Sequence, residues 1–478
     1  MNNRFQRWDY VNMIQSIPMS VREYNQLKNA FQGGFTHANP WYANRVCNNV
    51  TSFDFTSSYP AVMVAEKFPM SRGEYIDITS TEQFYKNIEL YCCLFDIEFT
   101  EIESTVTFEN YISSSRCWTL EKPQVANGRV VRASLLRTTI TEQDFLIIRK
   151  MYRWKTCRVG NFCRYQKFYL PTDFVKSVLK LYSDKTTLKN VSGKEIEYLA
   201  AKEQLNACYG MTVTDPVRPV IKYVNDWPKE PPKPDVINGV KDYNDDSSRF
   251  LCYQWGVWIT AYARRNLFSG ILECGNDYVY ADTDSIKIMN PDDHLQYIEK
   301  YNKMITEQLN RACKHHGIDP ELTRPKTIKG TPKPLGVWDF DGEYARFKTL
   351  GAKRYMFEYS LDERNKEHRG ELSITVSGLN KNVCVPFLCD GWYYGRDGIE
   401  HNSPFDKFTD QLYVPPEYTG KRTHTYIDEE RHGVVYDYKG VPYAFTAPSA
   451  VHLENSDYSL SIAREFADYI YDIQQSEE

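Results

Sequence analysis

The sequence lacks the features that define several classes of protein. No apolar run is long enough to cross a membrane, and the N-terminal segment Met1–Met13 contains no signal-peptide hydrophobic region. The 12 cysteines form no C-x-x-C pair and no ordered series with histidine. Structural zinc is therefore not expected, and free thiols in a reducing cytoplasm fit this pattern better than a disulfide framework. We expect a cytoplasmic protein with no membrane segment.

An excess of positive charge is also missing, since the formal net charge is −5. That balance argues mildly against a polyanionic partner, although an average over the chain hides local patches. Residues 145–170 hold seven Lys or Arg and no acid, and residues 324–354 hold eight against three acids. Both segments are interleaved with aromatic residues, as in surfaces that follow a nucleic-acid backbone. Solvated protein surface is the alternative interpretation of each segment.

One hydrophobic core does not accommodate 478 residues, so we expect about two to four subdomains. Apolar spacing predicts helices over 172–185, 194–210, 252–273 and 294–316, and strand-rich segments over 88–100 and 353–376. This mixture predicts an α+β fold. Prolines and turn residues exclude a regular element in 225–248, and a second irregular region covers 390–425.

Two acidic residues stand one residue apart in YVYADTDSIKI, residues 278–288. Residues 278–281 and 286–289 predict short strands, and the Asp-Thr-Asp-Ser between them predicts the turn of a hairpin. Acids at positions i and i+2 of a tight turn repel each other unless a cation lies between them. A cation site at Asp282 and Asp284 is one interpretation, and a solvated acidic turn is the other.

A third acid, Asp54, ends a β-prone run in TSFDFTSSYPAVM, residues 51–63. Two serines and a tyrosine follow, and Pro60 is predicted to open a helix that continues to about Lys67. The free N–H groups of such a helix start bind anions, phosphate included. Taken alone, the segment is an ordinary strand-to-helix junction. Together with the hairpin it supplies three carboxylates, enough to hold two divalent ions that activate a hydroxyl and stabilise leaving pyrophosphate.

A third group of polar residues lies in AAKEQLNACYGMT, residues 200–212. Lys202, Asn206 and Tyr209 share one face of a predicted helix, in an order that suits the triphosphate, sugar and base of a nucleotide. An exposed amphipathic helix face explains the same spacing. The preceding connection between helices offers two further cations close by, Lys185 and Lys189.

These three stretches resemble motifs A, B and C of family B DNA polymerases. The matching segments are Asp54–Pro60 (DFTSSYP) for motif A, Lys202–Gly210 (KEQLNACYG) for motif B and Tyr280–Ser285 (YADTDS) for motif C. Their order and approximate spacing also match. Ser58 stands where the family usually has Leu, and Ala207 stands where motif B has Ser. Neither departure replaces a residue that carries charge chemistry.

Three weaker matches extend the resemblance over about two thirds of the chain. Phe31–Gly34 is similar to the Y-x-G-G segment, which contacts the template. Thr260–Arg264 resembles a T-x-x-A/G-R motif on a palm helix, and Lys353–Tyr355 resembles the K-x-Y motif that holds the primer end. Beyond about residue 376 only a Tyr-rich, mostly β sequence remains, and the thumb is placed there by elimination.

The resemblance implies a right-hand polymerase fold of palm, fingers and thumb with two insertions. The implied divisions are an N-terminal entry segment with the Gly-Gly motif (1–48), palm with motif A (49–72), a first insertion (73–170), fingers with motif B (171–212), a second insertion (213–250), palm with motif C and K-x-Y (251–358), and thumb with the C-terminal region (359–478). The two insertions resemble the terminal-protein regions of protein-primed members of the family.

The resemblance also implies roles for individual residues. Two Mg²⁺ ions, with Mn²⁺ as a substitute, would be held by Asp54, Phe55, Asp282 and Asp284, and the catalytic residues would be Asp54, Asp282 and Asp284. The implied nucleotide-binding residues are Ser57, Ser58, Tyr59, Lys185, Lys202, Asn206 and Tyr209. The implied DNA-binding residues are Gly33, Gly34, Thr260, Arg264, Lys353 and Tyr355. In this scheme Tyr59 presses on the deoxyribose and excludes a ribose 2′-hydroxyl.

The expected activity is template-directed addition of dNTPs to a 3′-hydroxyl, by a monomer bound to template and primer DNA. Protein priming, with a terminal protein as a further partner, is expected for a phage or plasmid replicase acting in the host cytoplasm. The alternatives are a family B polymerase that uses nucleic-acid primers and a non-catalytic nucleic-acid-binding relic. A reverse transcriptase would carry two adjacent Asp residues in its hairpin.

One further expectation concerns proofreading. Before Asp54 the chain contains only two acids, Asp9 and Glu23, and no D-x-E. Two carboxylates do not build the metal site of a 3′–5′ exonuclease. We therefore expect no degradation of single-stranded DNA from its 3′ end by this chain.

Overall fold

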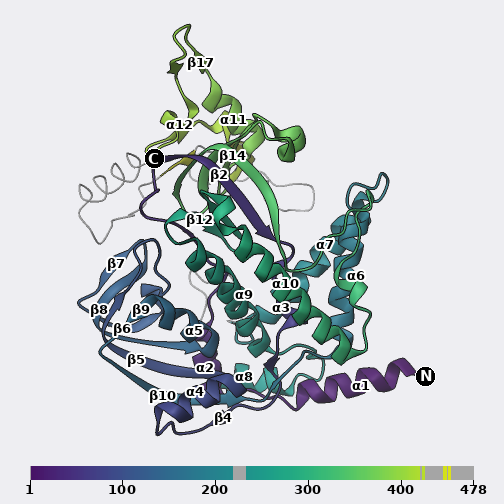
Figure 1. Cartoon of the computed structure of the whole chain (residues 1–478). Helices are drawn as coiled ribbons and strands as arrows, with labels where there is room; N and C mark the ends of the chain where they lie inside the picture. Colours follow the sequence, from purple (N-terminus) through teal and green to yellow (C-terminus); the bar gives the residue numbers. More distant parts are fainter. Residues whose placement is uncertain (1, 219–232, 420–421, 426–444, 449–450, 454–478) are drawn as a thin grey trace, which may run out of the picture.

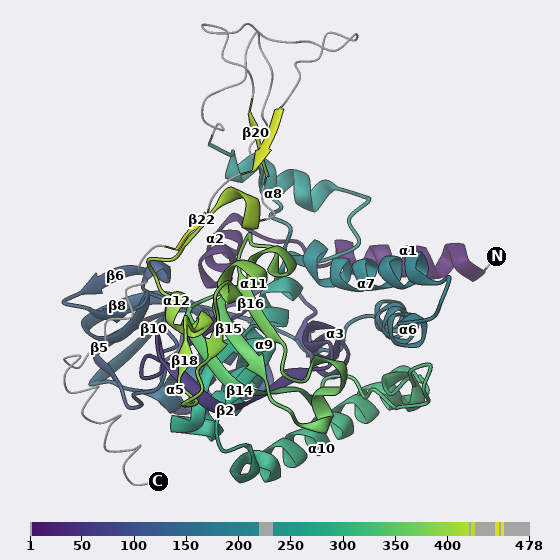
Figure 2. The same ribbon diagram turned by 90° about the horizontal axis from the view of Figure 1, so that it is seen from above.

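The structure is a computed structural model that describes residues 2–218, 233–419, 422–425, 445–448 and 451–453. Its elements surround a central sheet, with a second sheet on one side and a pair of long helices on the other (Figures 1 and 2). In the described residues, no helix has the length and apolar character needed to cross a membrane. All 12 cysteines are free.

The central sheet is antiparallel and has seven strands, in the order β1-β12-β13-β2-β14-β15-β16. Its strands are β1 (Thr36–Ala38), β2 (Val46–Phe55), β12 (Tyr278–Asp282), β13 (Ser285–Ile288), β14 (Trp338–Gly351), β15 (Arg354–Tyr359) and β16 (Leu372–Val376). The predicted hairpin of 278–288 is confirmed as β12 and β13. It lies directly beside β2, which carries Asp54, although more than 200 residues separate the two segments.

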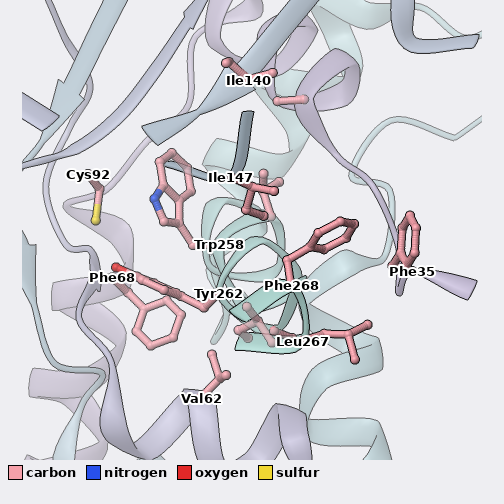
Figure 3. Packing of buried hydrophobic residues seen from close by; sticks show 14 of the residues in the cluster. Phe35, Val62, Phe68, Cys92, Ile140, Ile147, Trp258, Tyr262, Leu267 and Phe268 are labelled. Atoms are coloured by element: carbon pink, nitrogen blue, oxygen red, sulfur yellow. The ribbon is translucent and has the colours of Figure 1, made fainter. Parts of the chain in front are cut away.

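Three helices cover one side of this sheet, namely α3 (Ser58–Ala65), α9 (Tyr253–Cys274) and α10 (Pro291–His316). Helix α9 is buried along most of its length because apolar residues occur on all its faces. Figure 3 shows Trp258, Tyr262 and Phe268 of α9 pointing in different directions into the surrounding core. The predicted helices over 252–273 and 294–316 are thus confirmed, and α9 serves as a central support for the sheet.

Residues 73–170 contain all strands of a second antiparallel sheet and its two covering helices (lower left in Figure 1). Its elements are β4 (Glu74–Tyr75), α4 (Thr81–Leu90), β5 (Cys92–Ser104), β6 (Cys117–Glu121), β7 (Gln124–Ala126), β8 (Arg129–Thr141), α5 (Glu142–Met151), β9 (Tyr152–Arg153) and β10 (Thr156–Tyr165). The strand-rich prediction over 88–100 was therefore placed slightly early. Ser80 caps α4, which continues to Leu90 before the strand begins.

Two antiparallel helices, α6 (Thr172–Leu188) and α7 (Glu195–Gly210), pack against α3, across the molecule from the second sheet (right in Figure 1). Both predictions from periodicity are confirmed, although α6 extends three residues further than expected. The short strands β3 (Phe68–Pro69) and β11 (Lys167–Phe168) pair just before α6 and connect it to the core.

The N-terminal helices are α1 (Asn2–Gln15) and α2 (Val21–Ala30). The segment 225–248 was predicted to contain no regular element, and this was wrong because α8 spans Val236–Asp245. The last proline of the segment is Pro234, and the Asp235 side chain then caps the helix by accepting a hydrogen bond from the Asn238 N–H. The Asn244 side chain exchanges two hydrogen bonds with the Met19 backbone, which fixes α8 beside α2.

The C-terminal part is less regular, and two short helices accompany the strands of its mostly β sequence. Its elements are α11 (Lys381–Cys389), β17 (Tyr393–Tyr394), β18 (Glu400–His401), α12 (Pro404–Lys407), β19 (Tyr413–Val414), β20 (Arg422–Thr425), β21 (Phe445–Pro448) and β22 (Val451–His452). The Asn380 side chain caps α11, and Cys384 and Leu388 of this helix are buried in a separate small core with Met356 and Ile374 of the central sheet. This part therefore packs on the sheet edge that carries β15 and β16.

Candidate active site

Strand pairing brings the three predicted carboxylates together. Ser285 of β13 lies opposite Asp54 of β2, and the Phe55 N–H donates a hydrogen bond to the Asp284 carbonyl at 2.8 Å. The turn between β12 and β13 is tight, because the Asp284 N–H bonds to the Asp282 carbonyl at 2.6 Å. Asp54, Asp282 and Asp284 therefore meet at one end of three adjacent strands.

These carboxylates line an open cavity of about 410 Å³. Its lining consists of Asp54, Asp282, Thr283, Asp284, Ser285, Lys287, Asp341, Lys353 and Tyr355. Asp341 is a fourth carboxylate that the sequence analysis missed. A β-bulge between Phe340 and Gly342 inserts it into β14, and its side chain accepts a hydrogen bond from the Ser52 hydroxyl at 3.0 Å. The acidic alternation Asp-Phe-Asp at 339–341 was the one signal available in the sequence.

The cavity holds more negative charge than its own cations balance. Burial, followed by repulsion from Asp284 and Asp341, raises the pKa of Asp54 to about 8. Burial and repulsion from Asp282 raise the pKa of Asp284 to about 6. The Oδ1 atom of Asp54 is buried and has no hydrogen-bond partner. Oxygen ligands that lack a partner are what a divalent ion such as Mg²⁺ needs, so these residues fit the expected metal.

The carboxylates are not arranged around one point, as the ligands of a bound metal ion would be. Within the described residues no group of three or more His, Cys, Asp or Glu side chains surrounds a common point. Instead, the Lys353 ammonium holds both oxygens of Asp282, at 2.5 and 2.6 Å. The Phe55 ring is buried and stacks on Trp338 at 3.6 Å, so only the Phe55 backbone is able to serve as the expected ligand.

The turn after β2 faces the same cavity region from a helix start. Ser57 adopts the left-handed conformation with φ 58°, and its hydroxyl accepts a hydrogen bond from the Lys185 ammonium at 2.9 Å. Helix α3 begins at Ser58, so Pro60 is its third residue and not its first as predicted. The first turn of a helix leaves its N–H groups without partners inside the helix, and here those groups belong to Ser58 and Tyr59.

The predicted nucleotide-binding residues of α7 approach this helix start. The ring of Tyr209 stacks on the ring of Tyr59, with centroids 4.2 Å apart. Lys202 and Asn206 are exposed on α7. Burial, and then the neighbouring charges of Lys202 and Lys189, lower the pKa of Lys185. Cations of α6 and α7 and two stacked tyrosines therefore lie beside the carboxylates.

The Gly33–Gly34 loop touches the hairpin on its other side. A Cβ added to Gly34 would lie 2.6 Å from the Thr283 Cγ2 atom, and the Thr283 N–H donates to the Phe35 carbonyl at 2.6 Å. A second cavity of about 210 Å³ opens along this loop. It is lined by Gln32, Gly33, Gly34, Phe35, Ser113, Ser115, Arg116, Arg129 and Arg264. The predicted template segment is therefore adjacent to the hairpin of β12 and β13.

Direct DNA contact by Thr260 does not agree with the structure. Its side chain is fully buried, and its hydroxyl bonds back to carbonyls of its own helix because apolar neighbours leave no other acceptor. Arg264 is 2% exposed and forms an ion pair with Asp144 at 2.6 Å. It also donates to the carbonyls of Gln32 and Gly33. Its observed contacts thus hold the glycine loop in place.

Lys353 and Tyr355 line the carboxylate cavity on the side away from the Gly33–Gly34 loop. Lys353 has φ 57°, and its N–H donates to the Tyr280 hydroxyl at 2.9 Å. The Tyr355 ring lies 5.0 Å from the Tyr280 ring. Tyr280 of β12 thus joins the expected primer-binding residues to the hairpin that carries Asp282 and Asp284.

Several cations of the basic stretch 145–170 are neutralised within the second sheet. They form the ion pairs Arg153–Glu103, Arg158–Glu98 and Arg164–Glu74, with N···O distances of 2.6, 3.6 and 2.9 Å. The ordinary protein-surface interpretation therefore fits this stretch better than a continuous nucleic-acid track.

Four carboxylates on a central antiparallel sheet therefore lie beside a helix pair that supplies cations. A family model for DNA polymerase type B, organellar and viral, matches residues 9–303, which is more than half of the chain. The chain belongs to this family. It is 24% identical to the DNA polymerase of Bacillus phage Nf over 400 residues, covering 82% of this chain and 58% of the relative. The DNA polymerase of Bacillus phage phi29 is 22% identical over 346 residues, covering 71% and 50%.

Solved structures show the same fold. The orthorhombic crystal form of Phi29 DNA polymerase matches with a TM-score of 0.57 and 17% identity, over 91% of this chain and 64% of that chain. Phi29 DNA polymerase complexed with primer-template DNA and incoming nucleotide substrates matches with a TM-score of 0.56 and 17% identity, over 90% and 62%. The chain therefore has the α+β right-hand polymerase fold, and it spans less than two thirds of the length of these relatives.

Proposed function

We propose that this chain is a template-directed DNA polymerase that adds dNTPs to a 3′-hydroxyl. The observation that carries the proposal is the meeting of Asp54, Asp282, Asp284 and Asp341 in one cavity beside the α3 helix start. These residues would hold two Mg²⁺ ions. Divalent ions in such a site lower the pKa of an attacking hydroxyl and stabilise the leaving pyrophosphate.

The side chains around the carboxylates supply substrate binding. Lys185, which already donates to Ser57, is positioned to bind the triphosphate together with Lys202 of α7. The amides of Ser58 and Tyr59 hold phosphate oxygens at the helix start. The Tyr59 ring blocks the space of a ribose 2′-hydroxyl, while Tyr209 stacks on the nascent base pair.

Primer and template are proposed to lie on the two sides of the hairpin. Lys353 and Tyr355 hold primer phosphates on one rim, and the Gly33–Gly34 loop lets the template backbone approach closely on the other. In this scheme the α6–α7 pair forms the fingers, the central sheet forms the palm and the C-terminal part forms the thumb. The Phi29 enzyme that matches this fold was solved with primer-template DNA and incoming nucleotides.

Primer extension tests the proposal. The purified chain, given a primed template and Mg²⁺, should extend with dNTPs and much less with NTPs. Asp54→Asn should lower the rate of extension by at least about 100-fold. Loss of one electrostatic contact to the reacting atoms lowers kcat by about 10² or more. The affinity of this variant for primed DNA should stay within about three-fold of wild type.

The matched control is Asp339→Asn. Asp339 lies opposite Asp54 in the sheet but pairs with Lys333 at 2.5 Å and does not line the cavity. This variant should retain extension. Extension by Asp54→Asn at the wild-type rate would refute the assignment, and so would equal losses in both variants.

Protein priming is a second, more specific candidate. It is supported by the second sheet formed by 73–170, by the segment between α7 and α9, and by the phage origin of the relatives. A Ser, Thr or Tyr hydroxyl of a terminal protein would then replace the primer 3′-hydroxyl. Family B polymerases that use nucleic-acid primers remain the alternative.

The priming test must spare α8, because this helix packs against α2. Residues 219–232 lie outside the described part of the chain, and their replacement by a short Gly-Ser linker leaves α8 intact. If this segment encircles the template, products made in a single encounter should shorten while the first nucleotide is still added. Products of unchanged length would count against encirclement.

A further inference from the structure

Strand β13 carries a buried lysine inside the carboxylate cavity. Lys287 is 4% exposed and lies opposite Ser52 of β2, two residues from the position where Ser285 lies opposite Asp54. The Ser52 hydroxyl is the donor to Asp341. Because alternate residues of a strand share a face, Lys287 and Ser285 point to the same side of the sheet as the cavity they line.

The ammonium of Lys287 has one hydrogen-bond partner, the Ser285 hydroxyl at 2.7 Å. Within the described residues, no carboxylate oxygen lies within the 4.0 Å that defines an ion pair with it. This bond directs the ammonium along β13 towards the end of the strand, where Asp54 and Asp284 lie. A buried charge without a paired partner is costly, so the surrounding carboxylates must compensate it through space.

We propose that Lys287 is a positioning residue whose positive charge holds the carboxylates around the cavity and weakens the binding of divalent ions there. This inference rests on the proposed function, since it assumes that the cavity binds metal. Like charges a few ångströms apart repel strongly in a partly buried site. An ammonium in this position therefore lowers the affinity of each incoming cation and keeps the metal ions exchangeable between catalytic cycles.

A purely structural role is the competing explanation. Lys287 would then only fill space between β13 and β2. Removal of its charge would change stability but would not tighten metal binding. The two roles therefore predict opposite results for metal affinity in a folded variant.

The experiment measures Mn²⁺ binding to the whole chain by calorimetry, without DNA or nucleotide, together with thermal unfolding with and without Mn²⁺. Lys287→Met should bind Mn²⁺ at least ten-fold more tightly than wild type, and Mn²⁺ should raise its Tm by more. Lys287→Arg, which keeps the charge, should bind Mn²⁺ nearly as wild type does.

Lys348→Met is the matched control. Lys348 is also buried on the central sheet, at 7% exposure, but it donates to the Phe405 carbonyl and lies outside the cavity lining. Its loss should change stability without changing Mn²⁺ affinity. If Lys287→Met does not fold, Lys287→Gln carries the same expectation with a polar side chain.

The outcomes distinguish a failure of the role of Lys287 from a failure of the proposed function. Unchanged or weaker Mn²⁺ binding by folded Lys287→Met, with normal binding by wild type, would overturn the role of Lys287 alone. A wild-type chain that binds no Mn²⁺ would overturn the metal site, and with it both proposals.

Discussion

The rings of Tyr59 and Tyr209 stack with centroids 4.2 Å apart and planes inclined by 27°. Tyr59 lies in the first turn of α3, and Tyr209 lies near the end of α7. The contact therefore joins the start of α3, beside Asp54, to the end of α7. Each ring limits the movement of the other. The Tyr59 ring therefore has a fixed position next to the proposed nucleotide site.

Tyr59→Ala should relax sugar selection, because it removes the ring that blocks a 2′-hydroxyl. The ratio of kcat/KM for dNTP to that for NTP should fall at least about ten-fold, which corresponds to about 1.4 kcal/mol. Tyr59→Phe keeps the ring and should keep the selection. Single-nucleotide incorporation measures both ratios. An unchanged ratio in active Tyr59→Ala would show that another group excludes ribonucleotides.

Lys185→Ala should weaken nucleotide binding, because the Lys185 ammonium donates to the Ser57 hydroxyl directly before the α3 helix start. A charged hydrogen bond is worth about 1.5–3 kcal/mol, so KM for dNTP should rise by about ten-fold to 100-fold. Lys180→Ala is the control, since Lys180 is on the same helix but pairs with Asp184 at 2.6 Å. Steady-state extension at varied dNTP should separate the two. Equal KM values would remove Lys185 from the site.

The ion pair of Asp144 and Arg264 should make stability sensitive to acid. Burial alone would raise the pKa of Asp144, but Arg264 and hydrogen bonds from Tyr111 and Thr141 outweigh it and hold this pKa below its usual value. A depressed folded-state pKa contributes stability above the unfolded pKa of about 3.9, and this contribution is lost as the pH falls through the folded value.

Asp144→Asn should therefore lower the free energy of unfolding by about 3–5 kcal/mol at pH 7, because it leaves the buried Arg264 guanidinium without its carboxylate partner. The difference in unfolding free energy between wild type and this variant should shrink below about pH 4. Denaturant unfolding at pH 7, 5 and 3 measures it. A difference that stays constant over this range would mean that the pair is not the source of the acid sensitivity.

Local patterns in the sequence predicted the elements that carry most of the site. Helices α6, α7, α9 and α10 follow from apolar periodicity, and the hairpin of β12 and β13 follows from short β-prone runs around a turn. Helix α8 was missed because prolines end at Pro234, immediately before its cap, and the proline-rich composition of the whole window outweighed the local capping signal.

Other features depend on contacts between distant segments, which local patterns do not contain. Asp341 enters the cavity only because β14 pairs with β2 and has a bulge at this point. The buried roles of Arg264 and Thr260 depend on how α9 packs, since a short motif gives no measure of burial. Lys287 occupies an ordinary alternating position of its strand, and only the fold places Asp54 and Asp341 beside it.

The last prediction concerns the two neighbouring glycines, which differ in what surrounds them. A Cβ at Gly34 would lie 2.6 Å from Cγ2 and 2.8 Å from Oγ1 of Thr283, whereas a Cβ at Gly33 would meet nothing within 4 Å. Gly34 therefore allows the loop and the hairpin of β12 and β13 to touch. An added methyl group must displace one of them.

Gly34→Ala should destabilise the protein by about 1–3 kcal/mol, the usual cost of an overpacked contact, and should reduce extension because Asp282 and Asp284 flank the displaced Thr283. Gly33→Ala should leave stability nearly unchanged. Adding Thr283→Ala to Gly34→Ala removes the two closest atoms and should restore part of the lost stability. Denaturant unfolding and primer extension on all four proteins check this. If Gly34→Ala and Gly33→Ala behave alike, the close approach of Gly34 to the hairpin does not control the positions of Asp282 and Asp284.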